Sequence, residues 1–229
     1  MSRWDRLVSL LPKQEWVIIG WVLAIKVLLF VVGPKSVAIF DNKRLHGLRE
    51  CLEMWNRWDS LIFQRLAHHG YHVPFDLRAW PLFPWCIRLI GHFTGDYFIS
   101  ALLISSIASI IAAILLRRVV RLDYANAIAQ RAVWFFLIFP TAYILHVGYT
   151  ESFFLALTLG CFLAARTDRW WLAGLLGLFA CMTRANGFIL VPTLLAEVAT
   201  QYSSTRRWHW RWLWIAIIPL GFSVCLVLN

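Results

Sequence analysis

Three charged residues that lie far apart in the chain could together transfer a group between two oxygen atoms. Asp59 could act as a general base, because a carboxylate held in a cleft takes a proton from an acceptor hydroxyl. Arg184 lies among apolar residues, and its guanidinium fork matches the oxygens of a phosphate. Glu151 lies at the end of an apolar segment. An Asp and an Arg near one membrane face would supply both the base and the cation of a transfer that displaces a phosphate.

The carboxylate at position 59 has two structural interpretations, which the sequence leaves open. Apolar residues recur around it at spacings of three and four, which predicts one face of an amphipathic helix lying on the membrane surface. Asp59 then occupies the apolar stripe and needs a partner or a wet cleft. If a turn interrupts the helix near Asn56, Asp59 instead caps the helix that follows. The stripe comprises Leu48, Leu52, Trp55, Asp59, Ile62 and Leu66.

The other charged positions also permit ordinary structural roles. Glu151 could be a solvated helix end, and Arg184 could reach the membrane interface or pair with Glu151. Asn186 belongs to the same polar interruption as Arg184. The three histidines of segment 68–72 match no standard metal spacing, so no metal ligand is predicted, although a divalent metal is compatible with this chemistry.

The composition predicts a membrane protein. Of the 229 residues, 60% are hydrophobic and 15% are charged, whereas a soluble domain is about a quarter charged. Many of the 14 Trp lie near the ends of apolar runs, where amphipathic rings prefer the lipid headgroups. The net charge of +10 is divided among short clusters beside apolar segments, which favours contact with lipid and argues against nucleic acid as a partner.

Apolar stretches of nearly membrane-spanning length predict an all-α, polytopic bundle of about six to seven membrane segments. Cytoplasmic loops are enriched in Lys and Arg, so the basic clusters predict the orientation. Arg3, Arg6 and Lys13 place the N-terminus in the cytoplasm, and the clusters within 117–131 and 166–169 fall on the same side. The apolar stretches are Trp16–Pro34, Tyr97–Leu116, Ala132–Gly148, Ser152–Ala165, Trp170–Ala199 and Trp212–Leu228.

This topology makes residues 35–96 an extracytoplasmic loop and gathers Asp59, Glu151 and Arg184 near the outer face. The stretch Trp170–Ala199 fits either one span or two short passes that meet near Arg184. Two passes keep the arginines that follow in the cytoplasm, and they are tolerated where protein or a wet cavity covers the exposed backbone. We favour the two passes for this reason.

Three groups of short motifs occur in order along the chain. They are Arg57-Trp58-Asp59-Ser60 with Phe63, Ala67, Gly70-Tyr71 and Pro81-Leu82-Phe83-Pro84; Phe139-Pro140-Thr141-Ala142 with Tyr149-Thr150-Glu151-Ser152; and Thr183-Arg184-Ala185-Asn186-Gly187. Together they resemble the motifs of the PIG-V-type mannosyltransferases, which belong to the GT-C class of polytopic glycosyltransferases. The resemblance covers about residues 58–192, and both the order and the outer-face placement agree.

The resemblance implies a single GT-C-like membrane domain over residues 1–229, incomplete at its C-terminus because family members are longer. It implies a polyprenyl-phosphate sugar as donor, and transfer of a hexose, most simply mannose, to a lipid or glycan acceptor on the extracytoplasmic or ER-luminal face. The membrane would be the plasma membrane of a bacterium or the endoplasmic reticulum of a eukaryote. Asp59 would be the catalytic base, and the residues that bind the substrate would be Trp58, Tyr71, Glu151, Arg184 and Asn186.

Two other functions fit parts of the pattern. A lipid or polyprenol-linked transporter or flippase is one alternative, because broken helices and a buried arginine are typical of transporters. A transporter should hold its polar groups near the bilayer midplane and show an internal repeat, whereas here they gather at one face and no repeat is visible. A truncated, non-catalytic membrane relative is the other alternative.

Overall fold

The computed structural model describes residues 12–41, 45–72 and 79–227, and every regular element in these ranges is a helix. The predicted all-α membrane fold is therefore confirmed. Among the described residues, three helical segments are long and apolar enough to cross a bilayer, and α7 and α9 are shorter apolar helices. The number of spans stays a prediction. The three segments are Lys13–Phe40 (α2), Tyr97–Val120 (α6) and Trp210–Val227, which joins the 3₁₀ helix η4 (Trp210–Ile217) to α11 (Ile218–Val227).

The remaining elements connect these segments in two places. Three helices lie in the predicted outer loop between α2 and α6: α3 (Gly47–Glu53), α4 (Asp59–His69) and α5 (Leu82–Thr94). The rest follow α6: α7 (Asn126–Ile138), the 3₁₀ helix η2 (Pro140–Leu145), α8 (Glu151–Arg166), α9 (Trp170–Cys181), the 3₁₀ helix η3 (Ala185–Ile189) and α10 (Leu190–Thr205).

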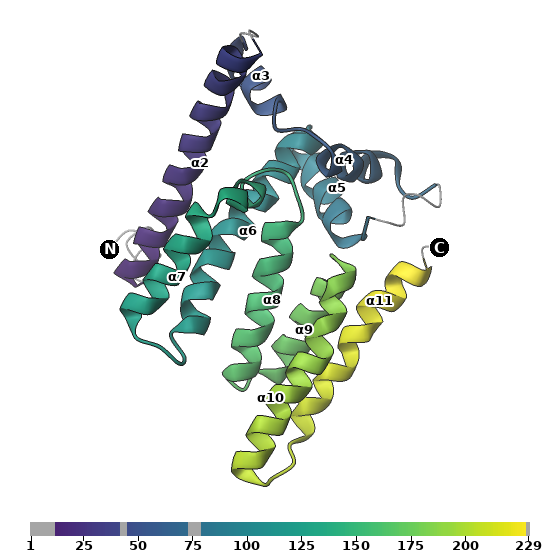
Figure 1. Ribbon diagram of the computed structural model, residues 1–229. Coiled ribbons are helices and arrows are strands. Elements are labelled where there is room, and N and C mark those ends of the chain that lie inside the picture. The colour runs from purple at the N-terminus through teal and green to yellow at the C-terminus, as the bar shows by residue number, and fades with distance from the viewer. Residues whose placement is uncertain (1–11, 42–44, 73–78, 228–229) are drawn as a thin grey trace, which may run out of the picture.

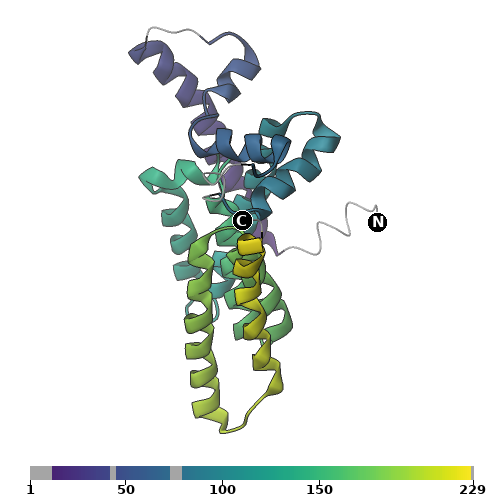
Figure 2. The ribbon, with the colours of Figure 1, turned by 90° about the vertical axis from the view of Figure 1, so that its right-hand side faces the viewer.

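The helices form a layer of antiparallel rods with the short loop helices across one end (Figure 1). The start of α6, the start of α8 and the end of α9 lie at this end, beside α4 and α5. The turns that follow α6, α8 and α10 lie at the opposite end, and Figure 2 shows the same separation from the side. The predicted basic loops thus share one end of the molecule. Which side of the membrane they face stays a prediction, and Arg3 and Arg6 lie outside the described residues.

One apolar core fixes α4 relative to α6, and a second core joins the helices that follow α6. Phe63 and Ala67 of α4 pack with Phe83 and Ile87 of α5 and with the first turns of α6. A larger core joins α8, α9, α10 and the η4–α11 segment around the fully buried Trp170. Because α6 and α8 also pack directly against each other, the outer-loop helices have a defined position over the start of α8.

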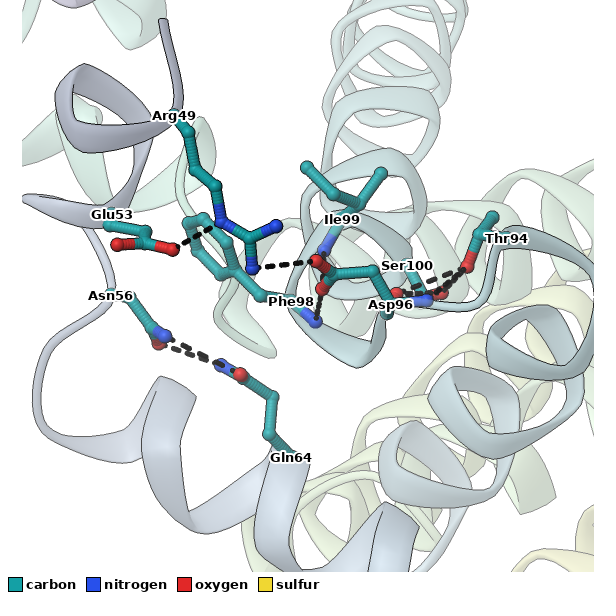
Figure 3. A network of polar contacts seen from close by, with 9 residues as sticks. All are labelled: Arg49, Glu53, Asn56, Gln64, Thr94, Asp96, Phe98, Ile99 and Ser100. Atoms are coloured by element: carbon teal, nitrogen blue, oxygen red, sulfur yellow. Dashed lines mark hydrogen bonds and ion pairs between the residues drawn. The ribbon is translucent and has the colours of Figure 1, made fainter. Parts of the chain in front are cut away.

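The continuous amphipathic helix predicted over residues 48–66 is wrong. α3 ends at Glu53, and α4 begins at Asp59. Gln64 of α4 donates a 2.6 Å hydrogen bond to Asn56, which holds the intervening turn against α4 (Figure 3). Trp58 has a φ of 46°, which no α-helix accommodates. Asp59 is therefore the first residue of α4, close to the alternative interpretation, and the helix dipole favours a negative charge there.

Polar contacts also tie α3 to the start of α6. Arg49 of α3 bonds Glu53 at 2.7 Å and reaches Asp96 at 3.5 Å (Figure 3). Asp96 caps α6, because its carboxylate accepts the backbone N–H groups of Phe98 and Ile99 at 2.8 and 3.1 Å. The same aspartate thus starts α6 and anchors the helix that precedes the Asp59 turn.

The break expected near Arg184 is present. α9 ends at Cys181, residue 184 has extended backbone, and η3 begins at Ala185. Gly187 makes this turn possible, since a Cβ there would lie 2.6 Å from the carbonyl carbon of Ala180. α9 and α10 run in opposite directions on either side of the break (Figure 1).

Candidate functional site

A cavity of about 240 Å³ lies where four separate parts of the chain meet. α4 contributes Asp59 and Phe63, and Thr150 comes from the turn before α8. Trp80 comes from the turn before α5. The break between α9 and η3 contributes four consecutive residues, 183–186, which include Arg184 and Asn186. Three of the residues predicted to take part in chemistry, Asp59, Arg184 and Asn186, therefore share one cavity.

Arg184 is held by two acceptors at the start of α8. Its Nη1 donates to Glu151 Oε1 at 2.6 Å and to Thr150 Oγ1 at 3.2 Å. The Arg184 and Glu151 side chains remain 37% and 28% exposed. The second carboxylate oxygen, Glu151 Oε2, is buried and accepts no hydrogen bond from the described residues. Arg184 thus has donors left for an anion, whereas Glu151 is not among the residues that line the cavity and orients Arg184 from behind it.

Asp59 is exposed on the wall of this cavity. The turn before α4 is exposed at Arg57 and Trp58, and the buried side chains beside it are Ser60 of α4 and Tyr149. The Tyr149 hydroxyl donates to the backbone carbonyl of Arg57 at 3.3 Å. Burial raises the pKa of this hydroxyl, and the negative charge of Asp59 raises it further. Tyr149 therefore remains a hydrogen-bond donor at neutral pH and supports the turn that carries Asp59.

Close backbone approaches bring the separate walls together. A Cβ on Gly148 would lie 3.0 Å from Ser60 Oγ, so the glycine lets the turn before α8 pack against α4. On the other wall, the Leu82 N–H donates to the Met182 carbonyl at 3.1 Å. This bond joins the turn that carries Trp80 to the end of α9.

Trp58 and Tyr71 are not among the cavity-lining residues. Trp58 is 74% exposed, next to Asp59 in the sequence. The Tyr71 hydroxyl donates to the Ala79 carbonyl at 2.8 Å, and Ala79 does line the cavity. Tyr71 thus supports a wall of the cavity, whereas Trp58 lies outside it.

Sequence reasoning missed three residues that shape the site. Thr150 and Thr183 line the cavity, and only their positions beside Glu151 and Arg184 could have signalled this. Lys26 of α2 donates to the His146 carbonyl at 3.0 Å and to Ser106 Oγ. It thereby holds the segment that leads to Thr150, and a lysine within an apolar span was the available signal.

No metal site is identified. In the described ranges, no three His, Cys, Asp or Glu side chains lie close enough together to hold a metal ion.

Several of the helices are long and apolar enough to cross a membrane, and Asp59, Arg184 and Asn186 line one small cavity at an end of the bundle. This arrangement defines a membrane protein with a polar site near one end of its helices. The chain belongs to the mannosyltransferase (PIG-V) family, whose model matches residues 46–228. The match covers the whole of α3 to α11, so the family resemblance expected from the motifs is confirmed.

Three curated relatives carry the name GPI alpha-1,6-mannosyltransferase 2. The Rattus norvegicus protein is 29% identical over 161 residues, which are 66% of this chain and 33% of the relative. The Mus musculus protein is 28% identical over 186 residues, which are 75% and 36% of the two chains. The Cricetulus griseus protein is 28% identical over 151 residues, 61% and 31% of the two chains. The chain thus spans about a third of the length of these relatives. No solved structure matches it significantly.

Proposed function

We propose that this chain carries the catalytic site of a membrane mannosyltransferase that takes mannose from a polyprenyl-phosphate donor. The observation that carries the proposal is the meeting of Asp59 and Arg184, 125 positions apart, at one cavity. A carboxylate and a guanidinium at one cavity are the two groups that a glycosyl transfer with a phosphate leaving group needs. The family and the printed names of the relatives support the same chemistry.

In the proposed reaction, the Asp59 carboxylate takes the proton from an acceptor hydroxyl. The acceptor oxygen forms a bond to the anomeric carbon of the sugar, and the bond from that carbon to the phosphate oxygen breaks. The polyprenyl phosphate leaves with the bonding electron pair, and its negative charge is stabilised by the Arg184 guanidinium. The acceptor attacks opposite the leaving group, so the anomeric configuration inverts.

The neighbouring residues orient the two reacting groups. Glu151 and Thr150 fix one edge of the Arg184 guanidinium and leave its other donors for phosphate oxygens. The Asn186 amide can bind sugar hydroxyls, and Trp80 offers a ring on which a sugar can stack. Glu151 would act through its hold on Arg184, because it does not line the cavity. Tyr71 positions the Trp80 wall, and Trp58 contacts the substrate only if the substrate extends beyond the cavity.

The proposed side of the membrane is the extracytoplasmic or ER-luminal face. The turns after α6, α8 and α10 carry arginines and lie at the end of the molecule opposite the cavity (Figure 1). The positive-inside rule assigns that arginine-rich end to the cytoplasm. The acceptor would be a lipid or glycan hydroxyl at the outer face, in keeping with the printed names of the relatives.

The proposal is tested by a transfer assay with the purified chain, radiolabelled polyprenyl-phosphate mannose and a set of lipid acceptors. General-base catalysis contributes about 10²- to 10⁴-fold, so Asp59→Asn should lower the transfer rate by at least about 10²-fold. Asp41→Asn, which changes an exposed aspartate outside the cavity, is the matched control and should leave the rate unchanged.

Undiminished transfer by folded Asp59→Asn would reject the base assignment. If the wild-type chain transfers sugar to no acceptor but moves the labelled donor across a vesicle bilayer, the transporter alternative replaces the enzyme proposal.

A further inference from the structure

A second, larger cavity of about 560 Å³ lies between α6, α8 and α9. Its walls are almost entirely apolar, and small residues on facing helices, such as Ala108 of α6 and Gly160 of α8, leave room between them. The lining runs along α6 from Ile104 to Arg118, a rise of about 21 Å at 1.5 Å per residue. One leaflet of the hydrocarbon core is about 15 Å deep. The groove is therefore long enough to take the acyl chain of a lipid from one leaflet.

The groove ends in a basic pocket of about 530 Å³ at the end of the molecule opposite Asp59. Arg118, Leu163, Thr167 and Arg169 line both spaces, so the two are continuous. The pocket lining holds four arginines and no acidic residue: Gln14, Arg117, Arg118, Arg121, Leu122, Leu163, Thr167 and Arg169.

The acidic side chains near this pocket already have partners. Glu15 pairs with Arg118 at 2.8 Å, Asp123 pairs with Arg166 at 2.7 Å, and Asp168 pairs with Arg211. Among residues 12–41, 45–72 and 79–227, no ion pair joins a carboxylate to Arg117, Arg121 or Arg169.

Three arginines thus remain available to an anion. Arg117 is only 6% exposed, and its Nε has no hydrogen-bond partner in the part of the chain that the structure describes. Its Nη2 donates to Asn126 at 2.8 Å and to Gln14. Within the described ranges, Arg121 and Arg169 form no ion pair. Arg117 is a buried guanidinium with one nitrogen unpartnered among the described residues, which is unfavourable without an anion beside it. Arg121 and Arg169 are exposed, so both can turn toward the same anion.

We propose that this continuous space binds an anionic phospholipid, with its phosphate among Arg117, Arg121 and Arg169 and an acyl chain in the groove. A soluble anion would fill the basic pocket and leave the apolar groove open, whereas a neutral lipid would leave the arginines uncompensated. Basic pockets at the cytoplasmic ends of membrane helices suit anionic headgroups for this reason. The basic pocket lies at the opposite end from Asp59, and the groove extends from it toward α5 at the Asp59 end. The groove shares no lining residue with the Asp59 cavity, so the two sites are distinct. The bound lipid would join α6 to α8 and α9.

Native mass spectrometry of the chain in neutral detergent tests this site, with dioleoyl phosphatidylglycerol as the anionic probe and dioleoyl phosphatidylcholine as the neutral one. The expected result is retention of phosphatidylglycerol at concentrations where phosphatidylcholine is lost. Each basic residue near an anionic headgroup contributes about fivefold, so the double variant Arg121→Gln, Arg169→Gln should weaken binding roughly 30-fold. Arg131→Gln with Arg207→Gln removes the same charge at the same end but outside the pocket, and should change binding less than threefold or so.

A second variant tests the groove itself. Ile111 lines it and is 44% exposed, so Ile111→Trp fills the groove without disturbing a buried position. It should weaken retention of phosphatidylglycerol and leave the binding of inorganic phosphate unchanged. The proposal is overturned if the two lipids bind equally, if the Arg121 and Arg169 changes match the control pair, or if Ile111→Trp has no effect. Phosphate competing as well as the lipid would also overturn it, because the site would then bind a free anion.

Discussion

The ion pair between Arg184 and Glu151 should be asymmetric when its members are removed one at a time. The two side chains are 37% and 28% exposed, so this ion pair is intermediate between a surface pair and a buried pair. A surface pair contributes about 0.2–1 kcal/mol to stability, and disrupting a buried pair costs about 3–5 kcal/mol. We therefore expect a coupling energy of about 1–2 kcal/mol from a double-mutant cycle. Arg184→Gln should cost more than Glu151→Gln, because it leaves a carboxylate with one buried oxygen uncompensated, whereas a freed Arg184 can extend to solvent.

The cycle consists of Arg184→Gln, Glu151→Gln and the double variant, each unfolded in mixed micelles with an increasing fraction of denaturing detergent. The exposed pair of Arg211 and Asp168 provides the matched control, with side chains 43% and 49% exposed. The coupling energy of this control pair should be about 1 kcal/mol or less. The reasoning is refuted if the Arg184 pair couples no more strongly than the control pair, or if Glu151→Gln is the costlier single change.

Three further changes test the parts that support the cavity. Lys26→Met should lower the free energy of unfolding by about 1–3 kcal/mol, since the His146 carbonyl loses its donor, and an unchanged detergent midpoint would contradict this. Gly187→Ala should lower the free energy of unfolding by about 1–3 kcal/mol and weaken donor binding, because the added Cβ would meet the backbone of α9. Gly20→Ala is the control: it has open space around it and should leave the free energy of unfolding nearly unchanged in the same titration. The raised pKa of Tyr149 means that its contribution to stability is complete below the ordinary value of 10.0 and is lost as the pH rises through the higher folded value. Tyr149→Phe should reduce the loss of folding stability at alkaline pH. If the stability of Tyr149→Phe depends on pH in the same way as that of the wild type, Tyr149 does not make this contribution.

The sequence predicts the membrane class, the break near Arg184 and the motif family, because each of them depends on local composition or spacing. Long apolar runs require lipid, and an arginine in such a run requires a partner. The Glu151 pairing was one of several interpretations, and only the packing of α8 against α9 selected it.

The local structure around Asp59 could not be predicted from periodicity. Apolar spacing continued through residues 48–66, but the turn that breaks the helix depends on the bond between Gln64 and Asn56 and on the positive φ of Trp58. Both are local features that leave no signal in the apolar periodicity. The role of Gly148 could not be predicted from the sequence, since a side chain there is crowded by Ser60 of α4 and Ala101 of α6, which only the packing brings close.

The most direct test of the central claim is the membrane side of the two cavity walls. Cysteines introduced as Asp59→Cys and Asn186→Cys, in a chain whose Cys51, Cys86 and Cys225 are replaced by serine, would be labelled in sealed vesicles of known orientation with a membrane-impermeant maleimide. Both positions should react from the same, extracytoplasmic side, and an Arg207→Cys control should react only after the vesicles are opened. Labelling of positions 59 and 186 from opposite sides would contradict the shared catalytic cavity.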